Sequence, residues 1–468
     1  MPQPRGCKKQ RPLRAGAALA IAAAAAFAAW PASAQTLTEA FAYTYNTNPQ
    51  ILAQRALLRA TDEQVPQALS NWRPTVTLTG QAGFERVGSA SAGPTNFGSF
   101  PTRSLDLRIT QPIYRGGRTE AATRQAINTV QATRAQTLGV ETTVFQAVAQ
   151  AYLDVVRDQT LVEVNRSNEQ VLRRQLEATQ DRFRVGEVTR TDVAQAESSL
   201  AQATANRISS EGTLEISRAN YARAVGHPPG RLVQPRERPI LPATREEAQT
   251  LAMQNNPNVI SANFTELAAR DNIDVVRGQL LPTISVVGDL SRNILPSTVS
   301  LRQLRTDTAS VVAQLTVPLY EAGTIWSQTR QAEQTVGQRR SQVDDARRLA
   351  VQLATSSWET LISARAAIAS FGAAVRAAQI ALEGIQQEAL VGSRTVLDVL
   401  ISQQQLFTTQ SQLITAQHDA AVAEYNLAAA IGRLIAPELR LPVQLYDMER
   451  HYRAVKDKLF GFGGGLKE

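Results

Sequence analysis

Residues 184–193 read RVGEVTRTDV and residues 390–399 read LVGSRTVLDV, so the order Val-Gly, five residues, Asp-Val occurs twice. Each copy lies between two long proline-free segments. A glycine permits the tight or left-handed backbone that a turn between helices needs, and an acid soon afterwards suits the positive end of a returning helix. The two stretches therefore predict two helical hairpins, with Gly186 and Gly392 at their tips.

The match extends outward from the two tips. In chain order it includes Asn48-Pro49 with Asn256-Pro257, Pro74 with Pro282, Pro112-Ile113-Tyr114 with Pro318-Leu319-Tyr320, and ARAVG at 222–226 with AAAIG at 428–432. The members of a pair are 208 residues apart up to Pro74 and 206 apart from Pro112 onward, which places variable loops between these two prolines. An ordered series of this kind predicts an internal duplication.

The duplication divides the chain into parts. We predict a cleaved signal peptide over residues 1–34, because basic residues precede an Ala-rich run and small residues stand before Gln35. The remaining parts are a first repeat (35–227), a proline-rich connector (228–242), a second repeat (243–433), and a C-terminal equatorial segment with a flexible tail (434–468).

Composition excludes several classes of function. The formal net charge is +8, but the signal peptide holds five basic residues and no acid, so the mature chain carries +3 and nucleic-acid binding is not indicated. The only cysteine, Cys7, lies in the signal peptide, which leaves no cysteine for a disulfide or a metal site. The histidines His227, His418 and His451 lack metal-ligand spacing, and no phosphate-binding or nucleophile motif occurs. We expect no enzyme and no cofactor.

Four stretches change to a two-residue period of apolar and polar side chains. They are residues 75–87, 103–113, 283–293 and 307–319. Each has about the length of a membrane strand, although a half-buried sheet in a soluble protein shows the same alternation. Pro112 and Pro318 are expected to end their strands, because proline cannot continue a central ladder.

The segments after the strands predict rods. Thr119 to Phe183 and Ser327 to Leu390 contain no proline, and at about 1.5 Å per residue each would form roughly 100 Å of helix. The returning helices carry heptads with a large residue such as Leu200 at one seam position and a small one such as Ala203 at the other. This pattern is typical of closely packed coiled coils.

No hydrophobic run after residue 34 is expected to reach the ~20 residues of a membrane helix, so a membrane crossing would require a β-barrel. Four strands cannot close a barrel, since the smallest closed forms have about eight. Other copies of the chain must then complete it. A dimer and a trimer both satisfy this rule, and twelve strands leave a lumen more readily than eight.

With its signal peptide, the duplicated helix-strand-strand-helix-helix order and the repeated Val-Gly/Asp-Val tips, residues 37–433 resemble the TolC family of outer-membrane efflux proteins. The resemblance implies a mainly α fold with a membrane β-barrel: a homotrimer with twelve strands in outer-membrane lipid and a coiled-coil helical tunnel in the periplasm. It implies an exit duct in a Gram-negative bacterium. The partners would be a periplasmic adapter (membrane fusion) protein and an inner-membrane transporter of the RND or ABC type.

The same resemblance implies roles for residues at the two tips. An acid matching Asp398 contributes to a ring at the periplasmic entrance, and an arginine matching Arg394 links neighbouring hairpins, here with Thr191 and Asp192 as natural partners. Helix capping by the acids and simple solvation of the arginine are the structural alternatives. The adapter-docking tips would consist of Val185, Gly186, Val391 and Gly392.

The chain departs from the family pattern near this entrance. Ile401 stands where a second acid is expected, and Ala389 stands where the family prototype has a latching tyrosine. We therefore expect the closed entrance to be held differently.

Two other kinds of protein remain as alternatives. A periplasmic coiled-coil adapter or scaffold would also contain a helical hairpin, but it would need neither the duplication nor four amphipathic strands. A porin without an export role would have no use for the long helices. The cargo, drugs or secreted proteins, is not encoded in any motif of the chain.

Overall fold

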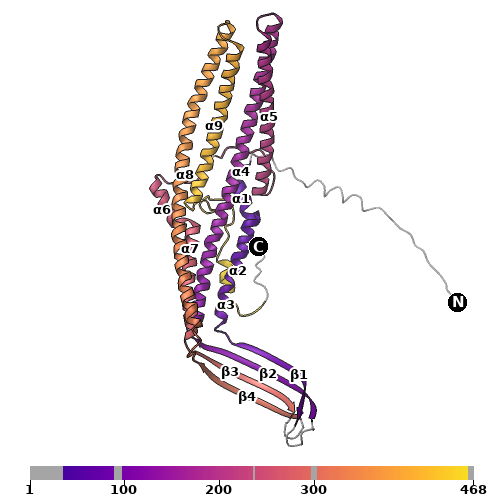
Figure 1. Cartoon of the computed structure of the whole chain (residues 1–468), viewed down its shortest axis with the longest axis vertical. Coiled ribbons are helices and arrows are strands. Elements are labelled where there is room, and N and C mark those ends of the chain that lie inside the picture. The colour runs from indigo at the N-terminus through magenta and orange to yellow at the C-terminus, as the bar shows by residue number, and fades with distance from the viewer. Residues whose placement is uncertain (1–34, 89–96, 236–237, 297–302, 462–468) are drawn as a thin grey trace, which may run out of the picture.

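The computed structural model describes residues 35–88, 97–235, 238–296 and 303–461. The predicted signal peptide lies outside these ranges, as do the last residues of the predicted flexible tail. Two helical hairpins stand side by side at one end of the molecule, and a four-stranded sheet lies at the other (Figure 1). The molecule is therefore a long rod with a tilted sheet at its base.

The hairpins confirm the predicted rods. The outgoing helices α4 (Arg118–Arg184) and α8 (Thr324–Leu390) have 67 residues each, which corresponds to about 100 Å. The returning helices are α5 (Arg190–Val225) and α9 (Val396–Ala430). Small seam residues such as Ala203 and Ala416 are buried, so the paired helices approach closely, as the heptads predict.

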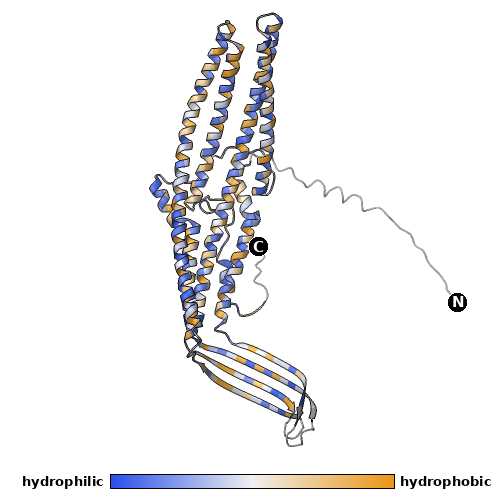
Figure 2. Cartoon of the chain, in the orientation of Figure 1, coloured by the Kyte–Doolittle hydropathy of each residue, from blue (hydrophilic) through white to orange (hydrophobic). Residues whose placement is uncertain are grey.

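The sheet is antiparallel in the order β1-β2-β3-β4. Its strands are β1 (Thr75–Gly88), β2 (Phe97–Arg115), β3 (Thr283–Pro296) and β4 (Gln303–Thr316). Hydrophobic and hydrophilic residues alternate along each strand (Figure 2), and many of the apolar ones are exposed, among them Leu78, Leu290 and Val311. A single chain therefore leaves the apolar face uncovered.

Several predicted strand limits are wrong: β2 begins at Phe97 rather than 103, β3 runs on to Pro296 rather than 293, and β4 begins at Gln303 rather than 307. Pro112 does not end β2, which runs on to Arg115, because a register shift between Pro112 and Tyr114 accommodates the missing N–H. β4 ends at Thr316, so the predicted extension to residue 319 is wrong. The chain leaves the sheet before Pro318, which cannot donate a ladder hydrogen bond.

Shorter helices pack along the rod between the hairpins and the sheet. They are α1 (Leu37–Thr47), α2 (Pro49–Asp62), α3 (Gln64–Ser70), α6 (Arg245–Asn255), α7 (Pro257–Arg277), the 3₁₀ turn η2 (Gly278–Leu280) and α10 (Arg450–Val455). Of these, α1–α2 of the first repeat correspond to α6–α7 of the second. The Asn-Pro pairs explain the breaks, because each asparagine caps the helix that its proline begins. Asn48 also donates to the carbonyl of Ala224 at 3.2 Å, and Asn256 donates to that of Ala430 at 3.1 Å, so both copies anchor a returning helix.

The main core lies where these short helices meet α4, α5 and α9. Tyr152 and Phe145 of α4 are fully buried there, and the Tyr152 hydroxyl lies 2.6 Å from the carbonyl oxygen of Val233 in the connector. The C-terminal segment packs against the same region through Leu434, Leu441 and Tyr446. Arg55 of α2 lies between Tyr45 and Tyr446, 4.3 and 4.9 Å from the ring centres.

One expectation about membrane helices needs correction. Among the described residues α8 alone is long and apolar enough to cross a membrane by length and composition, whereas the sequence was expected to contain no such run. Alanines in α8 raise its apolar character. One helix of this kind is weak evidence for a span, and α8 is paired with α9 in a coiled coil.

Candidate functional site

At the first hairpin tip, α4 ends, a glycine turns the chain, and a capped helix, α5, begins. Gly186 has φ of 83°, and its N–H donates to the Phe183 carbonyl at 3.0 Å, which ends α4. Thr189 then caps α5: its hydroxyl accepts from the N–H of Asp192 at 3.3 Å, and the Asp192 carboxylate accepts from the N–H of Thr189 at 2.8 Å. This reciprocal capping box fixes where the returning helix begins.

The second tip repeats this geometry. Gly392 has φ of 80°, and its N–H donates to the Ala389 carbonyl at 3.2 Å. Thr395 and Asp398 form the matching capping box, with Asp398 accepting from the N–H of Thr395 at 3.0 Å. Both predicted glycine turns are therefore confirmed, and both acids cap their helices.

Each tip has an ion pair between its outgoing helix and its turn, but the acid and the base change places between the two tips. In the first tip Arg182 of α4 pairs with Glu187 of the turn at 2.9 Å. In the second tip the helix supplies the acid instead, Glu388, and it pairs with Arg394 of the turn at 2.8 Å. Among the described residues Arg394 thus pairs locally with Glu388, and no hydrogen bond or ion pair joins it to Thr191 or Asp192 of the other hairpin.

The ionisation of the second tip follows from these contacts. Hydrogen bonds from the Thr395 backbone and hydroxyl, together with the nearby Arg394, lower the pKa of Asp398. The hydrogen bond and charge of Glu388 raise the pKa of Arg394. Asp398 is therefore a carboxylate and Arg394 a cation at neutral pH, and both remain in contact with solvent.

The predicted docking residues lie at the extreme end of the rod. Val185 is 73% exposed and Val391 is 81% exposed, so nothing in the single chain covers these apolar side chains. Gly186 and Gly392 are also exposed, and no atom lies within 4 Å of the place where a side chain would begin. The tips present bare turns, which suits contact with another molecule.

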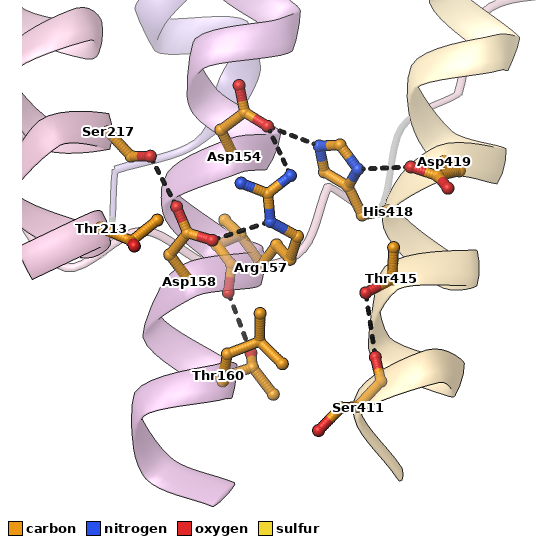
Figure 3. A network of polar contacts seen from close by, with 12 residues as sticks. Asp154, Arg157, Asp158, Thr160, Thr213, Ser217, Ser411, Thr415, His418 and Asp419 are labelled. Carbon is orange, nitrogen blue, oxygen red and sulfur yellow. Dashed lines mark hydrogen bonds and ion pairs between the residues drawn. The ribbon is translucent and has the colours of Figure 1, made fainter. Parts of the chain in front are cut away.

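A partly buried polar network connects the two hairpins (Figure 3). His418 of α9 places its Nε2 2.8 Å from Asp154 of α4 and its Nδ1 2.9 Å from Asp419. Arg157 reaches Asp154 at 3.0 Å and Asp158 at 2.7 Å. Ser217 of α5 donates to Asp158. The network joins α4 and α5 of the first repeat to α9 of the second.

Burial and pairing compete in this network. Burial alone would lower the pKa of His418, but its contacts with Asp154 and Asp419 outweigh that effect and raise the pKa. Burial would raise the pKa of Asp154, but His418 and Arg157 lower it. The charged forms of both groups therefore stabilise each other.

Sequence reasoning missed several of these residues. Thr189 and Thr395 could have been found, because Thr-x-x-Asp before a helix is the capping-box pattern. Glu388 lies six residues before Arg394. Side chains at this spacing meet here because α8 ends between them and the chain turns back. No sequence pattern places His418 beside Asp154. Groups of acids, histidines and cysteines that could hold a metal ion are absent from the described residues.

The two repeats of the rod match a known protein family. The outer membrane efflux protein family matches residues 44–227 and 249–433, which are the two repeats. The chain belongs to this family. The chain is 33% identical over 431 residues to the outer membrane efflux protein BepC of Brucella suis, covering 92% of each protein. It is 27% identical over 412 residues to TolC of Vibrio cholerae, covering 86% of this chain and 90% of that protein.

Solved structures agree on the fold of this efflux protein. The CmeC outer membrane channel of Campylobacter jejuni superposes with a TM-score of 0.75 at 13% identity, covering 90% of this chain and 89% of that one. The efflux protein is therefore a TolC-like outer-membrane channel of a Gram-negative bacterium, a transport protein and not an enzyme. Family membership also decides against the coiled-coil scaffold without a pore.

Proposed function

We propose that three copies of the chain form one duct, with a twelve-stranded barrel in the outer membrane and the helical rods in the periplasm. The observation that carries this proposal is the open sheet. β1 and β4 are both edge strands, and one face of the sheet is apolar and exposed. Unpaired strand edges are not tolerated in lipid, so β1 of one copy would pair with β4 of the next.

The hairpin tips would form the periplasmic entrance. Three copies would bring six tips together, with the Asp398 carboxylates as a ring that favours cations. Arg394 would exchange its local partner Glu388 for Asp192 and Thr191 of a neighbouring hairpin when the entrance closes. The guanidinium of Arg394 would have an acidic partner in both the open and the closed entrance. The two states would therefore differ little in free energy, as a gate requires.

Docking would use the bare turns of the tips, centred on Val185, Gly186, Val391 and Gly392. We propose a periplasmic adapter protein as the partner there and an inner-membrane transporter of the RND or ABC type behind it. Partial matches include the alkaline protease secretion protein AprF of Pseudomonas aeruginosa, 26% identical over 269 residues, and the fusaric acid resistance protein FusA of Burkholderia cepacia, 26% identical over 240 residues. Both secreted proteins and small molecules are thus candidate cargoes.

The decisive experiment is electron microscopy of the protein extracted from outer membranes in detergent, with its mass measured in the same sample. We expect a three-fold particle with a hollow tube of roughly 100 Å below a barrel. A monomer, a dimer or a rod recovered without detergent would contradict the proposed duct.

A further inference from the structure

The sheet carries an uneven distribution of charge between its two faces, and the arginines of one face lie toward the end farthest from the helices. Because β1–β4 are in direct register, residues on one face can be followed from strand to strand. The face that carries Leu78 and Leu290 also holds four arginines and one acid: Arg86, Arg103, Arg292, Arg305 and Asp307. The opposite face holds Glu85, Asp106, Asp289 and Arg108. The apolar face is thus cationic and the polar face anionic.

Three of the four arginines, Arg103, Arg292 and Arg305, form one band across β2, β3 and β4, which we call the arginine band. Arg103 of β2 and Arg305 of β4 both pair in register with Ile294 of β3, so they flank it in a single row. The next row toward the helices contains Leu105, Arg292 and Asp307. Neighbouring strands are about 4.8 Å apart, so the row from Arg103 to Arg305 spans roughly 10 Å.

Apolar residues fill the rest of this face toward the helices. The rows of Leu107, Leu290 and Ala309 and of Ile109, Gly288 and Val311 follow directly. From Ile284 to Leu290 the apolar part covers roughly 20 Å along the strand at about 3.4 Å per residue. This is close to the height of the apolar band in barrels, about 25 Å. The arginines therefore stand where the hydrocarbon region would end.

Asp307 orients two of the guanidinium groups. Its carboxylate lies 2.8 Å from Nε of Arg292 and 2.7 Å from the terminal nitrogen of Arg305. A guanidinium has five N–H donors, so both arginines keep donors free for a second acceptor. Arg103 makes no hydrogen bond or ion pair within the described part of the chain. Beside this band, a groove of about 440 Å³ is lined by Leu78, Leu105, Leu107 and Leu290 and bordered by the ion pair of Arg292 with Asp307.

We propose that this arginine band binds phosphate groups on anionic lipid headgroups of the outer leaflet, with an acyl chain in the leucine groove. The inference rests on the proposed placement of the sheet as the membrane wall with its strand loops outward. Arginine forks bind phosphate oxygens in pairs, and the cationic charge faces lipid while the acids face the lumen. A surface that served only hydration would not need this separation of charge.

The test is lipid binding by the detergent-purified full-length channel, followed by native mass spectrometry. The probes are a lipid A carrying two phosphates and the same lipid with both phosphates removed. Wild-type protein should prefer the phosphorylated probe. The double variant Arg103→Gln/Arg305→Gln should lose roughly ten-fold of that preference, since a basic residue near an anionic lipid surface is worth a several-fold change in affinity.

Arg108→Gln is the matched control, because Arg108 lies on the other face of the same sheet, paired with Asp289 at 2.9 Å. It should keep the wild-type preference. Arg103→Lys/Arg305→Lys keeps the charge without the fork and should lose only part of the preference. An equal loss in Arg108→Gln, or a wild-type protein indifferent to phosphate, would overturn the proposal.

Inorganic phosphate and plain vesicles separate the remaining outcomes. If millimolar inorganic phosphate displaces the lipid and binds as tightly as the lipid does, the band is a site for soluble anions. That result would overturn the assignment to lipid. Flotation of the protein with uncharged phosphatidylcholine vesicles tests the barrel by itself. Flotation without phosphate preference overturns the lipid site alone, whereas failure to float overturns the barrel and the lipid site together.

Discussion

Asp398 has two roles at the second tip that substitution can separate. As the third residue of α9 it accepts from the Thr395 backbone, and as a carboxylate with a lowered pKa it contributes negative charge. An asparagine keeps an oxygen for the hydrogen bond and removes the charge. Ile401, one turn further on, is 59% exposed and adds no charge, so Asp398 is the acid on which a ring at this level would depend.

We therefore expect Asp398→Asn to fold normally and to reduce the cation preference of the channel several-fold. The measurement is the reversal potential across a salt gradient in planar bilayers. Asp181→Asn is the control, because Asp181 is an exposed acid near the other tip that pairs with Arg184 and caps no helix. Equal selectivity of Asp398→Asn and wild-type channels would exclude the ring.

Arg394 and Glu388 allow a sharper test of the gate. If Arg394 closes the entrance by pairing with a neighbouring hairpin, Arg394→Gln should raise the single-channel conductance several-fold. Glu388→Gln frees Arg394 for that neighbour and should leave the entrance closed. If Glu388→Gln opens the channel as much as Arg394→Gln does, the local pair seen in the single chain is the latch and the proposed exchange of partners is wrong.

At the scale of the element, each hairpin tip depends on a backbone conformation that only glycine adopts easily. Gly392→Ala meets no neighbouring atom within 4 Å, so its cost comes from the positive φ alone, about 1 kcal/mol. We expect a lower unfolding midpoint in detergent. Gly212→Ala, inside α5 and equally free of neighbours, should instead stabilise by about 0.5–1 kcal/mol. Shifts of the same sign in both variants would contradict this account.

The elements differ in how far sequence could predict them. The rods and strands could be predicted from the spacing of apolar residues. Apolar residues repeat every 3.6 residues on one face of a helix and every two residues on one face of a strand. The bulge after Pro112 was missed because a register shift depends on the partner strand β3 and not on the proline itself. The individual contacts of the C-terminal segment could not be predicted, because Arg55 and Tyr446 meet only after the chain has folded back.

At the scale of the whole molecule, duplication creates a problem of assembly. Two similar hairpins could each fold alone, yet a duct wall needs them at a fixed relative position. Apolar seams hold α4 to α5 and α8 to α9, and the main core packs Tyr152 of the first repeat with Tyr425 of the second. The network of His418, Asp154 and Arg157 adds a polar contact that also crosses from one repeat to the other. A polar contact can fix such a position because its geometry is specific, whereas alanine seams tolerate sliding.

This role of the network predicts how stability depends on pH. The pKa of His418 is raised in the folded state, so its contribution is complete below the unfolded value near 6.5 and is lost as pH rises through the raised pKa. The pKa of Asp154 is lowered, so its contribution is present above about pH 4 and is lost as pH falls through the lowered pKa. The network should contribute most between about pH 4 and 6.5.

His418→Gln should therefore destabilise the detergent-purified channel by ~2 kcal/mol at pH 6, the usual worth of hydrogen bonds to charged groups, and by less at pH 9. The measurement is the thermal unfolding midpoint from pH 5 to 9. His227→Gln is the control, because the ring of His227 faces Tyr43 and the Pro228 carbonyl rather than a carboxylate. If the unfolding midpoint of His418→Gln changes with pH as steeply as that of the wild type, protonated His418 does not join the two repeats. The apolar core that both repeats share must then fix their relative position.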